Sequence, residues 1–110
     1  MNPIAERLEA LLAAGKDTAL LRCTLGQAAL DAEDSAKASE HLQQAVTLDP
    51  HYSVAWKLLG KARLAQGDPA AARAAWTQGL TSAEAKGDAQ VVKELRVFLK
   101  RLDKQEGGGI

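Results

Sequence analysis

The chain has little of what many folds and reactions depend on. Among its 110 residues there are one cysteine, one phenylalanine, one tyrosine and three prolines. Cys23 alone cannot form an internal disulfide, and no Cys and His residues have the spacing of a zinc site, so we expect no metal and no cofactor. No apolar run approaches the roughly 20 residues of a membrane-spanning helix. Fourteen basic residues balance fourteen acidic ones, so no overall field would attract nucleic acid or an anionic membrane.

The residues that are abundant favour helix. The chain is 46% hydrophobic and rich in alanine, with almost no runs of β-branched residues, which predicts an all-α fold. Its length matches one domain with a single modest core. The N-terminal stretch carries acidic residues where a secretion signal needs a basic start, so we expect a cytoplasmic protein.

The sequence repeats itself with a period of 34 residues. Residues 19–52 align with 53–86, and Leu25-Gly26 coincides with Leu59-Gly60. The identical pairs continue into the second half of each copy, at Asp34 with Asp68, Ala36 with Ala70, Ala38 with Ala72, Gln44 with Gln78 and Thr47 with Thr81. The Leu-Gly and Asp pairs do not depend on the high alanine content, so the repeat is genuine.

Capping residues mark where the helices begin and end. Asn2-Pro3 and Asp68-Pro69 each place a cap before a proline at the first helical position. Gly67 and Gly87 are each followed directly by an Asp, and Gly15 precedes Asp17 by two residues. This pattern is typical of a place where one helix ends and the next is capped at once. The predicted helices are 3–14, 17–32, 35–48, 51–66, 69–85 and 89–104, and their short connections make successive helices antiparallel.

The second copy resembles the tetratricopeptide repeat. The residues that match this family's pattern are Trp56, Leu59, Gly60, Ala72 and Trp76, while Gly79 and Glu84 depart from it. The first copy matches at Leu25, Gly26, Ala38, Leu42, Ala45 and Pro50 and departs at Arg22. The resemblance implies antiparallel helix-turn-helix repeats that form a short right-handed α-solenoid of about six helices.

The small residues of this pattern have a structural purpose. Gly and Ala let two helix backbones approach closely, and large residues fill the spaces beside them. We therefore expect Trp56 and Trp76 to be core residues rather than platforms for a ligand.

The flanking helices fit the same frame. Ile4, Leu8, Leu11 and Leu12 fall at the positions of a second helix, so the first helix would cover one open end. Val91, Val92, Leu95, Phe98, Leu99 and Leu102 take inward positions of a first helix, so 89–104 would be a capping helix at the other end. We expect a single domain over 1–106, with repeats at 19–52 and 53–86, and a disordered tail at 107–110.

The resemblance also implies a concave face formed by the first helix of each repeat, where such proteins hold a peptide. The residues that we expect to bind the peptide are Leu20, Cys23, Gln27, Leu30, Val54, Lys57, Leu58, Lys61, Leu64, Lys93 and Val97. The last helix adds Glu94, Lys100 and Arg101 to the same face. If Lys57, Lys61 and Lys93 converge there, the face would bind an acidic or C-terminal peptide; the alternative is that these lysines are only solvated.

One known subtype is excluded. Tetratricopeptide domains that clamp the C-terminal carboxylate of heat-shock chaperones use Lys, Asn and Arg, and the corresponding residues here are Cys23, Gln27, Leu58, Gln90 and Glu94. An acidic ligand would need another geometry.

Catalysis has little support in the residues. We expect His41 on an outward helix face and His51 at a helix start, both far from Cys23, which itself suits packing better than chemistry. The primary hypothesis is a non-catalytic, monomeric binding module for another protein, such as an adaptor, a scaffold or a co-chaperone-like protein. The alternative is self-association, in which repeat edges stack on those of another copy.

Overall fold

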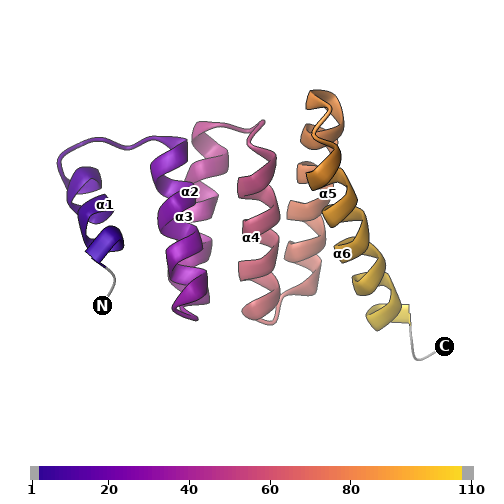
Figure 1. Ribbon diagram of the computed structural model, residues 1–110. Helices are drawn as coiled ribbons and strands as arrows, with labels where there is room; N and C mark the ends of the chain where they lie inside the picture. The colour runs from indigo at the N-terminus through magenta and orange to yellow at the C-terminus, as the bar shows by residue number, and fades with distance from the viewer. Residues whose placement is uncertain (1–2, 108–110) are drawn as a thin grey trace.

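A computed structural model describes residues 3–107, and in that range the chain is helical and contains no strand. The helices are α1 (Pro3–Ala13), α2 (Ala19–Asp31), α3 (Ser35–Leu48), α4 (Ser53–Ala65), α5 (Pro69–Lys86) and α6 (Ala89–Gly107). They stand in a row with α1 and α6 at its two ends (Figure 1). The all-α prediction is confirmed. The largest departure from a predicted range is at α6, which continues to Gly107, and the rest of the predicted tail lies outside the described residues.

Polar side chains cap α2, α3 and α5, whereas α4 begins after Tyr52 without a side-chain cap. Thr18, Asp34 and Asp68 each accept a hydrogen bond from the backbone N–H three residues ahead, at 3.1, 3.1 and 3.0 Å. Each bond satisfies one of the N–H groups that a helix leaves unpaired at its start. Pro69 then occupies the first turn of α5, where its missing N–H is harmless.

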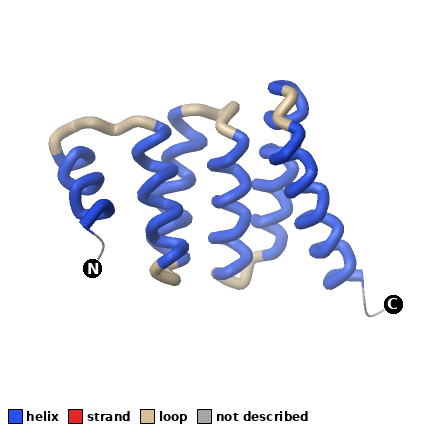
Figure 2. The backbone as a smooth tube through the Cα atoms, viewed as in Figure 1, coloured by secondary structure: helices blue, strands red, loops and turns tan. Residues whose placement is uncertain are grey.

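The turns inside the two repeats share one backbone geometry but differ in residue type. Gly67 adopts a left-handed conformation with φ of 81°, and Glu33, which is its counterpart one repeat earlier, has φ of 59°. Figure 2 shows that these turns are short, whereas a longer connection joins α1 to α2. A side chain at positive φ is strained, so the first repeat achieves the same turn at a higher energy.

Glycines bring the two helices of each repeat into close contact. A Cβ added to Gly26 would lie 2.4 Å from Cγ of Leu42, and one added to Gly60 would lie 2.1 Å from Nε1 of Trp76. These contacts are shorter than any real Cβ contact, so only glycine allows the large partner to occupy its place. The predicted role of the Leu-Gly pairs is confirmed.

The core has two connected parts. The first lies among α2, α3, α4 and α5 and is centred on Leu42 and Leu59, whose side chains are fully buried. The second joins α5 to α6 through Trp76, Leu95 and Leu102. The last helix therefore covers the second repeat, as its apolar spacing predicts.

The first helix covers its end of the array poorly, contrary to expectation. No residue of α1 is buried, and Ile4 and Leu11 are 66% and 47% exposed. A salt bridge of 2.7 Å joins Glu9 to Lys37 of α3. The apolar spacing of α1 is that of a second helix, but no first helix precedes it in the described chain to bury its outer side.

The two tryptophans differ in burial. Trp76 is buried, as predicted, whereas Trp56 is only partly buried, and its indole N–H donates to the carbonyl oxygen of Pro50 at 2.8 Å. A Cβ added to Gly79 would lie 2.8 Å from Cβ of Trp56, so a larger residue at this position would displace the tryptophan. Trp56 packs against the core from its edge, so the prediction that both tryptophans are core residues holds in full only for Trp76.

Candidate partner-binding surface

The first helices of successive repeats, α2, α4 and α6, are neighbours, since α4 contacts both of the others. We call the surface that they form the concave face. Each of these helices exposes one large apolar side chain at a predicted peptide-binding position: Leu20 is 67% exposed, Leu64 38% and Val97 43%. Gln27, Lys61 and Lys93 are also exposed, while Leu30, Val54 and Lys57 are half-buried.

Two of the predicted peptide-binding residues are not on the surface. Cys23 and Leu58 are buried in the core among α2, α3 and α4, so they support the concave face without offering it contact area. Burial raises the pKa of the Cys23 thiol above its usual value, although the Tyr52 hydroxyl beside it acts in the opposite direction. A thiol with a raised pKa stays protonated at neutral pH, and such a thiol is a poor nucleophile.

Lys57 is paired rather than free. Its Nζ donates to both carboxylate oxygens of Glu94 at 3.3 Å, and its side chain is 15% exposed. The pair links α4 to α6 across the concave face. Glu94 therefore supplies a counter-charge to Lys57, which weakens the attraction for an acidic peptide that the sequence analysis considered for this lysine.

The predicted convergence of three lysines is not found. Lys61 lines a hollow of about 440 Å³ between α4 and α6, together with Phe98 and Arg101. Lys93 lines a different hollow, of about 650 Å³, which lies between the C-terminal end of α5 and α6 and also contains Val97. The register placed Lys57, Lys61 and Lys93 on one face, but it could not show that α6 presents Arg101 rather than Lys93 to Lys61.

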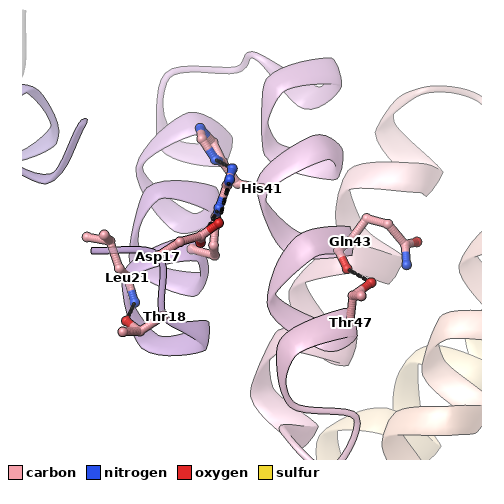
Figure 3. Close-up of polar contacts among 7 residues, drawn as sticks. Asp17, Thr18, Leu21, His41, Gln43 and Thr47 are labelled. Atoms are coloured by element: carbon pink, nitrogen blue, oxygen red, sulfur yellow. Dashed lines mark hydrogen bonds and ion pairs between the residues drawn. The ribbon is translucent and has the colours of Figure 1, made fainter. Parts of the chain in front are cut away.

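His41 is a second correction. It is 8% exposed rather than on an outward face. Nη1 of Arg22 donates to Nδ1 of His41 at 3.1 Å, and the same guanidinium binds Asp17 through Nε at 2.8 Å and Nη2 at 3.1 Å. Figure 3 shows Asp17 and His41 in this network, beside the cap that Thr18 forms for Leu21. Arg22 departs from the repeat pattern, which expects a large residue at this position, and its guanidinium takes that place by pairing with Asp17 and His41.

The network shifts the pKa values of its members. A hydrogen bond from Arg22 lowers the pKa of Asp17. Burial lowers the pKa of His41, and the charges of Arg22 and Lys37 lower it further. His41 is therefore neutral at pH 7 and holds α3 against α2, which is a structural role.

Two features of other protein classes are missing from residues 3–107. No helix there is long and apolar enough to cross a membrane. No group of three or more His, Cys, Asp or Glu side chains in the described chain is placed to hold a metal ion.

The helical hairpins, their Leu-Gly contacts and the row of first helices define a class of helical repeat protein. The chain belongs to the tetratricopeptide repeat family, whose model matches residues 29–91. It is 58% identical to the TPR repeat-containing protein PA0015 of Pseudomonas aeruginosa over 99 residues, which cover 90% of this chain and 94% of that protein.

A solved structure extends the likeness to the whole arrangement. The solution structure of protein BPP2914 from Bordetella parapertussis is 53% identical in sequence and superimposes with a TM-score of 0.81, over 98% of this chain and 96% of that one. Repeats of this family generally mediate protein–protein interaction and are typically non-catalytic.

Proposed function

We propose that the protein is a non-catalytic adaptor or scaffold of the cytoplasm that binds a segment of a partner protein along its concave face. In this proposal residues 1–106 act as one domain. The observation that carries it is the exposure of large apolar residues on two neighbouring first helices, Leu20 on α2 and Leu64 on α4. Exposed apolar side chains set among polar ones such as Gln27 and Lys61 suit a peptide that offers both kinds of contact.

Contacts beneath the exposed residues support the concave face. The Lys57–Glu94 pair and the buried Cys23 and Leu58 hold α2, α4 and α6 in place beneath the exposed residues. A preformed surface loses less conformational entropy when it captures a flexible segment, so its contacts contribute more to affinity.

A matched pair of variants tests the proposal. Leu20→Ser with Leu64→Ser removes apolar area from the concave face, and Leu11→Ser with Leu48→Ser removes exposed leucines from α1 and α3. Partners are captured on the full chain, their bound segments are mapped by cross-linking, and each variant is compared with the original. The proposal requires that the first variant loses the mapped segment and the second keeps it. The reverse result would place binding outside the concave face.

Self-association is a second candidate, and one observation favours it. α1 has the spacing of a second helix and an exposed outer side, while α6 takes the place of a first helix and exposes Val97 beside the 650 Å³ hollow. α1 of one copy placed on α6 of the next would complete a repeat. Sedimentation equilibrium over a range of concentrations tests self-association. Self-association predicts oligomers that Leu11→Glu and Val97→Glu each abolish. A protein that stays monomeric at every concentration would exclude it.

A further inference from the structure

The hollow between α4 and α6, which we call the α4–α6 pocket, has an aromatic and aliphatic interior. Its floor is made by Trp76 and Leu102, both buried, and Leu64 and Phe98 stand at its sides. The Trp76 and Phe98 rings lie 5.3 Å apart between centroids at 43°, which fixes their relative position. A volume of about 440 Å³ is enough for one or two side chains of a bound peptide.

Two cations stand at the edge of the pocket. Nζ of Lys61 lies 5.2 Å from the centroid of the Phe98 ring, and Arg101 lines the pocket from α6. Within residues 3–107, no salt bridge involves either of them. The acidic residues nearest in sequence on α6, Asp103 and Glu106, are held by Arg73 at 2.6 Å each.

The charge of this pocket distinguishes it from the other hollows. No Asp or Glu lines it, whereas Asp31 and Asp34 line the hollow between α1 and α2, and Glu84 lines the one beside Lys93. A locally positive rim therefore exists on a chain that is neutral overall. Its complement is an acidic group placed next to an apolar one.

We infer that the α4–α6 pocket is the anchor site of the concave face, and that it binds a partner segment in which an apolar residue adjoins a carboxylate. The apolar side chain lies against Leu64, Phe98 and Trp76, and the carboxylate lies between Lys61 and Arg101. The carboxylate comes either from an Asp or Glu side chain or from the C-terminus of the partner. This inference rests on the proposed function, and it names the chemistry that the partner must present.

The test begins with a selection against the full chain. Random heptapeptides are displayed in two formats, one internal and one with a free C-terminus, and the selected sequences are synthesised with a fluorescent label. The inference requires an apolar residue beside an acidic group in the selected peptides. Amidation of the C-terminus then distinguishes the two sources, because it weakens binding only where the terminal carboxylate is used. Selected peptides that lack an acidic group in both formats would overturn the inference.

A charge-matched pair of variants locates the peptide. Lys61→Ala with Arg101→Ala should weaken binding at least tenfold, and Lys86→Ala with Lys93→Ala, which removes the same charge outside the pocket, should change it less than twofold. Equal weakening by both pairs would show a general electrostatic effect and overturn the inference. Circular dichroism of each variant confirms that helicity is unchanged, as expected for exposed side chains.

Tryptophan fluorescence provides an independent readout. In a Trp56→Phe background the emission of Trp76 alone should change as the peptide fills the pocket. If binding persists in the Lys61 and Arg101 variant but is lost in Leu20→Ser, the peptide binds elsewhere on the concave face. That result would overturn the inference that the α4–α6 pocket is the anchor site, and it would leave the proposed function intact. A chain that selects no peptide contradicts both.

Discussion

Arg22 of α2 donates a hydrogen bond to Nδ1 of His41 on α3, over 3.1 Å, in the interior of the first repeat. A guanidinium has no acceptor, so this contact exists only while Nδ1 of His41 carries no proton. Protonation of His41 would break this hydrogen bond. It would also place the positively charged imidazole of a buried residue against the Arg22 guanidinium. The packing of α3 on α2 therefore depends on pH.

The first prediction concerns this dependence. The pKa of His41 is lowered from 6.5 in the folded chain by burial and by Arg22 and Lys37, although Glu40 and Glu9 oppose the shift. The unfolded chain therefore takes up the proton first, so stability is fully present above pH 6.5 and falls as pH decreases through the folded pKa.

Thermal unfolding at pH 7.5, 6 and 5 measures the effect. Each 1 kcal/mol lost should lower Tm by about 4 °C. His41→Gln should flatten the dependence, since Gln accepts from Arg22 without titrating, whereas the exposed control His51→Gln should keep it. A dependence that is the same in both variants would assign it to other groups.

The second prediction concerns Gly60. Its replacement by Ala forces the Trp76 indole to move, because the new Cβ would lie 2.1 Å from Nε1. Overpacking costs about 1–3 kcal/mol, and the better helix propensity of Ala returns up to about 1 kcal/mol, so we expect a net loss of free energy of unfolding. Urea titration measures the loss. It should shrink when Gly60→Ala is made in a Trp76→Leu background, and an equal loss in both backgrounds would mean that the indole is not the obstacle.

The third prediction exploits the two equivalent turns. Glu33→Gly should raise the free energy of unfolding by up to about 1 kcal/mol, because the side chain at φ of 59° is strained. Gly67→Glu, the reverse change at the matching position, should lower it by about 1–2 kcal/mol. Chemical denaturation of both variants is the measurement. Changes of the same sign in the two variants would show that backbone strain does not decide the outcome.

Much of the fold could be predicted from the sequence because its signals are local. The period of 34 residues, the cap at Asp68 and the Leu-Gly pairs are read from neighbouring residues, and each has its expected place in the structure. The inward apolar positions of α6 follow from helical periodicity for the same reason.

The site depends on contacts between residues far apart in the chain, and there the sequence was less informative. Glu94 neutralises Lys57 across 37 positions, and Arg101 rather than Lys93 joins Lys61. The sequence predicts His41 on an outward helix face, but Arg22 gives it a partner inside the repeat. A repeat register gives the face of each residue; it does not give the rotation of the last helix or the pairing of its charges.

The last prediction contrasts the two end helices. A chain that begins at Lys16 lacks α1 but keeps the Arg22 network and the Thr18 cap. Among its described residues, α1 contains no buried side chain, and its salt bridge to the rest of the chain, Glu9–Lys37, is exposed, so the free energy of unfolding should fall by less than about 1 kcal/mol. Leu95→Ala, in contrast, removes a fully buried side chain that joins α6 to α5, and should cost about 2–5 kcal/mol. Urea denaturation of both proteins at low concentration, where each is monomeric by sedimentation, gives the comparison. If the truncated chain lost as much stability as Leu95→Ala, α1 would be the true cap that its apolar spacing predicts. The expected outcome, a small loss, leaves α1 as a helix whose outer apolar side contributes little to the stability of its own chain.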